Sequence, residues 1–356
     1  LEHALTRAGV PAFFDRGSVM RVLRPVLATT LAELYPGARD EALAGDASTR
    51  LFHRLVLPDG GTRVVMDYGA PFEGETDDVR LARLFEQAAL PVARVLHTLP
   101  EAGALVLEDL GDETLESALA HAASGGRPTR DDLYRSAVRL AAEIATRGTE
   151  ALLRSDRAQG PALDGERFLF EMRFFLEHYV GGFLGRPELA TKVREAVEEL
   201  ALGAASHPRV LCHRDYHSRN IMVRGDGALA LVDIQDARWG PDTYDLASLL
   251  CDAYVDLGEH EAAELSDLYW QQLAGSPDIA ALRARFDVAA AQRMIKALGT
   301  FGYQIAVLGR DRYRSAIPRT LERLARFLPA RAATASLGEA LLREGLLSLG
   351  GRKPLE

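Results

Sequence analysis

The side chains best suited to chemistry lie in one stretch of the sequence, from His213 to Asp233. An apolar lead-in ends at His213, Asp215 comes two residues later, and Asn220 follows five residues after that. A second apolar run then delivers Asp233. A carboxylate such as Asp215 can accept the proton of a substrate hydroxyl, while an amide oxygen and a second carboxylate are hard ligands that suit magnesium carrying phosphates. The stretch therefore indicates phosphoryl transfer to an alcohol.

The turn at Asp226-Gly227 decides how Asn220 and Asp233 meet. Between two apolar runs this dipeptide predicts a two-residue hairpin loop with a type I′ turn, because both central positions of that turn need positive φ. Such a loop places position 220 opposite position 233. Side chains directly opposite share a face of the strand pair, so we expect Asn220 and Asp233 to lie side by side. The alternative is a plain surface hairpin after a core strand, in which the order of these polar residues is a coincidence.

Length and composition describe a soluble globular chain with two lobes. The chain has 356 residues, 47% hydrophobic and 26% charged, which exceeds one ordinary core. The net charge of −9 argues against a general nucleic-acid binder, and no apolar run is long enough to span a membrane. Two cysteines, Cys212 and Cys251, make no disulfide framework and favour the cytoplasm. We infer no protein partner.

Hydrophobic periodicity predicts a strand-rich first part and a helical remainder. Strands are expected at 50–57, 63–67, 94–96 and 104–107. Thr76 is a predicted N-cap of a helix between these strands, and residues 1–45 read as helical pieces. Beyond residue 111 helices are expected at 133–145, 168–179, 190–201, 246–254, 262–273, 280–308 and 318–327. Strands around one helix, followed by a helical remainder, predict an α+β fold.

Taken together, these segments resemble the aminoglycoside phosphotransferase/choline kinase superfamily. Within it, the sequence is most similar to the anomeric kinases of N-acetylmuramate and N-acetylglucosamine used in bacterial cell-wall recycling. His213 to Asn220 has the H-R-D-x-x-x-x-N layout of protein-kinase-like phosphotransferases. Other segments that resemble the subgroup are 45–50, 64–67, 107–111, 235–237, 240–241, 243–245, and Gln292 and Arg293 with Lys296.

The resemblance implies a protein-kinase-like fold of two lobes. A small β-rich N-terminal lobe, residues 1–107, would cover the nucleotide. A larger, mostly helical C-terminal lobe, residues 108–356, would carry the hinge, the catalytic loop, and the metal and substrate sites. Asp215 would act as base or orienter for the sugar hydroxyl, and Asn220 and Asp233 would hold Mg²⁺. The implied reaction moves the γ-phosphoryl group of ATP to the anomeric C1 hydroxyl.

The resemblance also implies an ATP site, with one departure from the superfamily pattern. Ser48 and Arg50 lie on the loop expected to cover the phosphates, and the backbone from Glu108 to Leu110 is expected to meet adenine. Met66 stands where the wider superfamily carries a phosphate-binding lysine, although the sugar-kinase subgroup looks similar there. Arg50 is our candidate to meet the phosphate charge, because guanidinium binds phosphate bidentately. The alternative is that Arg50 is an ordinary exposed strand residue.

The predicted substrate residues lie mainly on the helices of the second part. Arg293 and Lys296 are three residues apart and share a helix face, so they could hold the lactyl carboxylate of N-acetylmuramate. The alternative is a solvated basic stripe. Glu177 and Asp236 are further candidates for sugar contacts. Asp245 is expected either to cap a helix or to support the catalytic loop.

Two other functions compete with the sugar kinase. One is phosphorylation of another small alcohol, such as an aminoglycoside, choline or homoserine. The other is a nucleotide-binding module without turnover, which the methionine at position 66 suggests and the joint presence of Asp215, Asn220 and Asp233 opposes. The leading expectation is an enzyme that uses ATP and Mg²⁺ on a small sugar, without nucleic-acid or membrane partners.

Overall fold

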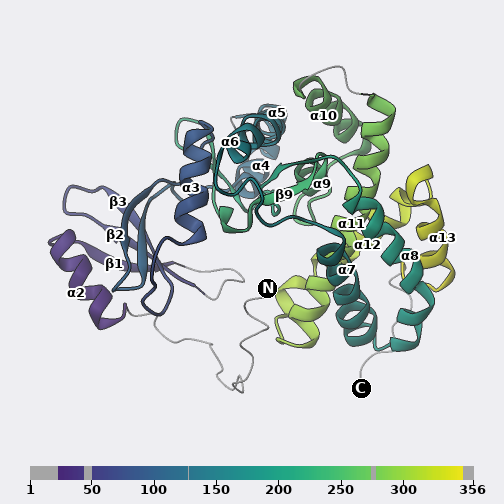
Figure 1. Cartoon of the computed structure of the whole chain (residues 1–356), viewed down its shortest axis with the longest axis horizontal. Coiled ribbons are helices and arrows are strands. Elements are labelled where there is room, and N and C mark those ends of the chain that lie inside the picture. The colour runs from purple at the N-terminus through teal and green to yellow at the C-terminus, as the bar shows by residue number, and fades with distance from the viewer. Residues whose placement is uncertain (1–22, 44–49, 127, 274–277, 348–356) are drawn as a thin grey trace. The chain divides into compact units, whose positions relative to one another are not determined.

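The computed structural model describes residues 23–43, 50–126, 128–273 and 278–347 (Figure 1). The chain divides into two compact units. The first combines the chain up to Gly74 with Arg94–Asp109, and the second combines Glu75–Ala93 with the chain from Leu110 onward. Within the described ranges, no helix is both long enough and apolar enough to cross a membrane.

The first unit is one antiparallel sheet with a helix on one face (Figure 1). Its elements are α2 (Pro25–Leu34), β1 (Arg39–Leu43), β2 (Leu51–Val56), β3 (Thr62–Asp67), β4 (Val95–Leu99) and β5 (Ala104–Glu108), and the strand order is β1-β2-β3-β5-β4. Leu27 and Leu31 of α2 pack on Leu55 and Val65 of the sheet, which closes a small apolar core. Arg24, just before α2, pairs with the buried Asp67 at 2.6 Å and fastens the helix to the end of β3.

Two expectations for the first part of the chain are corrected. Arg39–Leu43 is an edge strand and not a helical piece, because its backbone pairs with β2 even though the sequence RDEAL carries no alternating apolar pattern. Residues 75–93, expected in the N-terminal lobe, belong to the second unit. Their helix α3 (Asp77–Gln87) begins at the predicted N-cap Thr76, and Asp77 pairs with Arg157 of the second unit at 2.6 Å.

The second unit is mostly helical, as predicted. Besides α3 its helices are α4 (Leu115–Ala123), α5 (Arg130–Glu143), α6 (Thr149–Arg154), α7 (Gly165–Phe174), α8 (Pro187–Ala205), α9 (Tyr244–Leu250), α10 (Glu259–Gln272), α11 (Ile279–Ala306), α12 (Ala316–Phe327) and α13 (Ala335–Arg343). Two segments are π-helical, η1 (Ile144–Gly148) and η2 (Phe175–Phe183), and three are 3₁₀ turns, η3 (Ile234–Asp236), η4 (Asp311–Tyr313) and η5 (Ala332–Thr334). The unit also contains two short antiparallel strand pairs. They are β6 (Arg209–Cys212) with β9 (Arg238–Pro241), and β7 (Ile221–Val223) with β8 (Leu229–Leu231).

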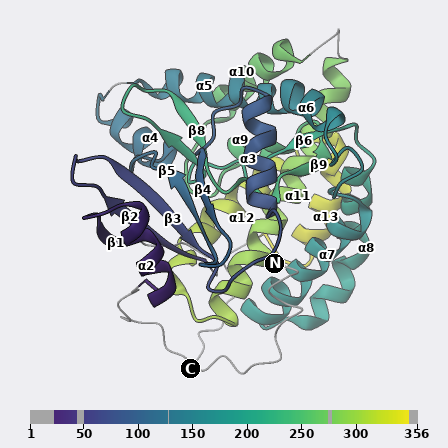
Figure 2. The same cartoon turned by 60° about the vertical axis from the view of Figure 1, so that its left-hand side comes forward.

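The long helix α11 is the central helix of this unit. It packs against α7, α8, α9, α12 and the π-helical segment η2, and α13 packs on α8 and α12 (Figures 1 and 2). Gly302 permits the close approach to η2, because a Cβ there would lie 2.5 Å from the carbonyl oxygen of His178. The polar residues of α11 are therefore held at a fixed position against a large apolar core.

Candidate active site

A buried carboxylate fixes the start of the catalytic loop, where β6 ends. The backbone N–H groups of His213 and Arg214 donate to the two oxygens of Asp245, at 2.7 and 3.0 Å. Arg214 has a φ of 81°, a left-handed value that side chains rarely adopt. Burial raises the pKa of Asp245, against the opposing effects of His213 and the two N–H donors. Asp245 therefore supports the loop, while Thr243 occupies the N-cap position of α9.

Further hydrogen bonds tie the loop to three other elements. The buried hydroxyl of Tyr216 donates to the carbonyl of Ala137 on α5 at 2.7 Å, and the N–H of Ser218 donates to Asp252 at 2.8 Å. The ring Nε2 of His213 lies 2.9 Å from the carbonyl oxygen of Val232, the residue before Asp233. The backbone around Asp215 and the backbone before Asp233 are thus linked directly.

The hairpin that carries Asn220 and Asp233 has a register one residue away from the predicted one. Ile221 pairs with Leu231 across β7 and β8, and the N–H of Val232 donates to the carbonyl of Asn220. Position 220 therefore lies opposite position 232, and the predicted pairing with 233 is wrong.

The turn chemistry explains the shifted register. The N–H of Arg224 donates to the carbonyl of Ala228, so the loop holds three residues instead of two. Gly227 has a φ of 83°, whereas Asp226 stays out of the left-handed region that a type I′ turn requires. The carboxylate of Asp226 accepts the N–H of Ala228 at 3.0 Å, which stabilises the longer loop.

The side chains of Asn220 and Asp233 nevertheless meet. Nδ2 of Asn220 donates to Asp233 at 3.3 Å and to the backbone carbonyl of Asp215 at 3.0 Å. Asp233 has a φ of 62°, and this left-handed bend brings its carboxylate to Asn220. Since the amide nitrogen makes these two contacts, the amide oxygen is the Asn220 atom that could bind a cation. An amide oxygen and a carboxylate fit Mg²⁺, which takes one or two protein carboxylates together with phosphates.

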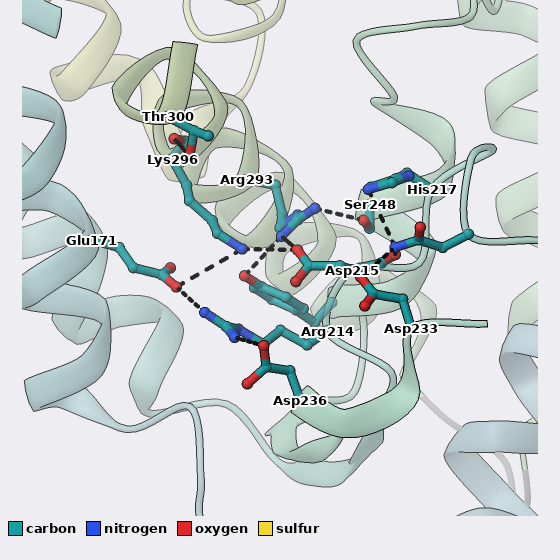
Figure 3. Close-up of polar contacts among 12 residues, drawn as sticks. Glu171, Arg214, Asp215, His217, Asp233, Asp236, Ser248, Arg293, Lys296 and Thr300 are labelled. Carbon is teal, nitrogen blue, oxygen red and sulfur yellow. Dashed lines mark hydrogen bonds and ion pairs between the residues drawn. The ribbon is translucent and has the colours of Figure 1, made fainter. Parts of the chain in front are cut away.

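Two basic side chains of α11 hold the carboxylate of Asp215 (Figure 3). Nη1 of Arg293 and Nζ of Lys296 lie 3.2 and 3.0 Å from the same oxygen, Oδ1. Their side chains are only 12% and 15% exposed, so the solvated basic stripe is wrong. Burial would raise the pKa of Asp215, but Lys296, Arg214 and Arg293 outweigh it and hold that pKa well below its usual range. Asp215 is therefore ionised at neutral pH.

Arg293 is itself held in place from α9. Its Nη2 donates to Ser248 at 2.8 Å and its Nη1 to the hydroxyl of Tyr244 at 3.3 Å. The guanidinium also lies over the Tyr244 ring, 5.1 Å from the centroid. The donor that faces Asp215 is consequently fixed in orientation.

Glu171 is the main site residue that we did not predict. This α7 carboxylate is 5% exposed, and its Oε1 lies 3.9 Å from Nζ of Lys296 and 3.5 Å from Nη2 of Arg214 (Figure 3). Its other oxygen accepts a hydrogen bond from Gln292 at 2.8 Å. A signal was present in the sequence, because Glu171 lies four residues before Phe175 on the apolar face of the predicted helix.

Asp236 joins the same cluster, whereas Glu177 does not. Arg214 and Arg238 reach Asp236 at 2.9 and 2.6 Å, and 38% of its side chain remains exposed. Glu177 lies on η2 with 74% of its side chain exposed, beside His178. The structure therefore brings Asp236, Arg293 and Lys296 together around the catalytic loop and leaves Glu177 outside that group.

The predicted nucleotide residues lie mostly in the first unit. Arg50 stacks over Tyr68, 5.1 Å from the ring centroid, and its Nη1 lies 3.7 Å from the sulfur of the buried Met66. Glu108 pairs with Arg94 at 3.1 Å, and Leu110, in the second unit, is half-buried. Ser48 lies outside the described residues. Contacts of these residues with a nucleotide stay predictions.

The sequence is similar to a known protein family and to a curated relative. The model of a family described as "Phosphotransferase enzyme family" matches residues 40–285. The N-acetylmuramate/N-acetylglucosamine kinase of Neisseria meningitidis serogroup B is 32% identical to this chain over 308 residues, which cover 83% of this chain and 88% of the relative.

Solved structures agree with the fold. A gentamicin complex of APH(2″)-IIa matches with a TM-score of 0.60 at 14% identity, over 85% of this chain and 97% of that one. Choline kinase from Cryptosporidium parvum Iowa II matches with a TM-score of 0.55 at 13% identity, over 91% and 98% of the two chains. The predicted kinase-like α+β fold is confirmed. Because the family model matches residues 40–285, most of this chain, the chain belongs to the phosphotransferase enzyme family.

Proposed function

We propose that this phosphotransferase moves the γ-phosphoryl group of ATP to the anomeric C1 hydroxyl of N-acetylmuramate or N-acetylglucosamine. The observation that carries the proposal is the catalytic carboxylate. Asp215 is ionised and held by Arg293 and Lys296, in the same loop as Asn220, whose side chain donates to Asp233. The relative from N. meningitidis, similar over most of its length, is named for these two sugars.

The geometry of Asp215 supports a simple sequence of events. Arg293 and Lys296 occupy Oδ1, so Oδ2 is the oxygen that would receive the sugar hydroxyl. The hydroxyl oxygen bonds to the γ-phosphorus while the bond from that phosphorus to the ADP oxygen breaks, and the hydroxyl proton passes to Asp215. The loose transition state depends more on positioning and charge neutralisation than on a strong base. A carboxylate with a lowered pKa therefore suffices.

Asn220 and Asp233 are the residues that would hold Mg²⁺. The bound ion would neutralise charge on the phosphate oxygens. On the nucleotide side we propose Ser48 and Arg50 for the phosphates, and the backbone of Glu108 and Leu110 for adenine. These assignments are supported by the family resemblance of the segments that contain them.

On the sugar side we propose Asp236, Arg293 and Lys296, and we no longer include the predicted Glu177, which lies outside this group with 74% of its side chain exposed. The carboxylate of Asp236 is the best supported, because two guanidinium groups orient it while 38% of the side chain stays exposed. It can thus accept hydrogen bonds from sugar hydroxyls.

We also propose a cytoplasmic enzyme that works on amino sugars recovered from the cell wall. Cys212 and Cys251 are both free thiols, as suits a reducing compartment. ATP, the proposed donor, is supplied in the same compartment.

ADP release from purified protein with magnesium-ATP tests the proposed acceptor. We expect turnover with N-acetylmuramate and N-acetylglucosamine, and none with choline, homoserine or kanamycin, because the relative that is similar over most of its length is named for these two sugars. Glucose and galactose in the same panel report how much the N-acetyl group contributes. Turnover confined to choline, homoserine or kanamycin would overturn the sugar assignment, and bound ATP without turnover on any compound would favour a nucleotide-binding module.

A further inference from the structure

Lys296 stands out in a chain that uses arginine for nearly all of its positive charge. The sequence has only three lysines, Lys192, Lys296 and Lys353, among 42 basic residues. Lys192 is 57% exposed and lies far from Lys296 in the sequence. It pairs with Glu344 and not with the residues around Asp215. An ammonium group can lose its proton within proteins, whereas a guanidinium cannot. One oxygen of Asp215 is therefore held by a permanent charge, Arg293, and by a titratable one.

The groups that face Lys296 come from three elements (Figure 3). The catalytic loop contributes Asp215 at 3.0 Å and the guanidinium of Arg214, α7 contributes Glu171 at 3.9 Å, and α11 itself contributes Arg293. Burial and Arg293 lower the pKa of Lys296 to about 8, although Asp215 and Glu171 oppose that change. Lys296 therefore loses its proton much nearer to neutral pH than an exposed lysine does.

We propose that Lys296 is a positioning residue that acts through Asp215, and that Glu171 keeps its ammonium charged and in place. With Lys296 protonated, two cations hold Oδ1 and direct Oδ2 toward the substrate hydroxyl. When Lys296 is deprotonated, Arg293 is the one cation of the pair that still holds the Asp215 carboxylate. Less of the negative charge of Asp215 is then neutralised near the incoming phosphoryl group. The rate is therefore full below the pKa of Lys296 and falls as the pH rises through it.

Nuclear magnetic resonance of lysine side chains measures this charge directly, because the sequence holds only three lysines. The signal of Lys296 is the one that disappears in Lys296→Arg. In protein labelled at the lysine side chains we expect that signal to titrate with a midpoint near 8. Glu171→Gln removes a negative neighbour, so the midpoint moves to lower pH. A midpoint at the ordinary 10.5, or one unmoved in Glu171→Gln, would overturn the proposal.

Activity supplies the second readout, and this part of the test rests on the proposed function. The wild-type kcat is expected to fall with the same midpoint as the Lys296 signal. Lys296→Arg, which keeps the charge, should lose that alkaline decline, and Glu171→Gln should shift it to lower pH. Lys192→Arg is the matched control and should reproduce the wild-type profile.

The two readouts separate the possible failures. If Lys296 and Glu171 had only a structural role, Lys296→Arg and Glu171→Gln would each lower kcat by the same factor at every pH. This result would contradict the proposal. If Lys296→Arg does not fold, Glu171→Gln still decides through the shift of both midpoints. If no sugar is turned over, the acceptor assignment fails while the titration of Lys296 still tests its contacts with Asp215 and Glu171.

Discussion

The Asp215→Asn variant is expected to lose about 10²–10⁴-fold in kcat, the usual contribution of a positioned general base. An amide cannot take the proton of the sugar hydroxyl, and it no longer neutralises Arg293 and Lys296, which both face Oδ1. The affinity for ATP is expected to stay close to that of the wild type, because Asp215 is not among the predicted nucleotide contacts. Initial rates of ADP release at saturating sugar, together with calorimetric ATP binding, measure both quantities.

The Asp226→Asn variant is the matched control for this substitution. Asp226 lies in the exposed turn of the same hairpin, and asparagine can still accept the N–H of Ala228 that its carboxylate accepts now. Its kcat should equal that of the wild type. Near-normal turnover by Asp215→Asn would mean that another group handles the hydroxyl proton, and the role of Asp215 would have to be abandoned.

The Asp233→Asn variant is expected to lose at least about 10²-fold in kcat, since a metal ion supplies several kcal/mol and ~1.4 kcal/mol is tenfold. The substitution removes the only charged ligand in the proposed Asn220–Asp233 pair. It preserves the backbone, because asparagine tolerates the left-handed φ of 62° found at this position. The Mg²⁺ concentration that gives half the maximal rate should rise together with the loss of kcat.

The Asp233→Ala variant separates charge from backbone strain. Alanine adopts a left-handed φ less readily than asparagine, so this variant should also lose conformational stability in a urea titration. Asp233→Asn should unfold close to the wild-type midpoint. An Asp233→Asn protein with the wild-type dependence on Mg²⁺ would show that this carboxylate does not bind the ion.

The catalytic loop could be predicted from the sequence because its geometry is local. Asn220 lies five residues after Asp215 in one loop, and Asp233 follows the second strand of the adjoining hairpin. The hairpin register was harder to predict. The side chain of Asp226 stabilises a three-residue loop, which the dipeptide Asp226-Gly227 alone does not indicate. The left-handed bend at Asp233 compensates, so a correct pair of side chains came from a wrong register.

The target of the basic residues on α11 depends on tertiary packing and was not predictable from spacing. The interval of three residues correctly placed Arg293 and Lys296 on one helix face. It did not show that this face meets Asp215, which is 78 residues from Arg293 in sequence. Glu171 was overlooked for the same reason, because its partners Lys296 and Arg214 come from other elements.

The product formed from N-acetylglucosamine and magnesium-ATP tests the central claim most directly. Phosphorus–proton NMR of the purified product should show coupling between the phosphorus and the anomeric proton, because we propose that the C1 hydroxyl binds Oδ2 of Asp215. The 1-O-methyl derivative should give no product. Phosphate attached to C6, or phosphorylation of the 1-O-methyl sugar, would contradict the proposed chemistry while leaving the family and the fold unchanged.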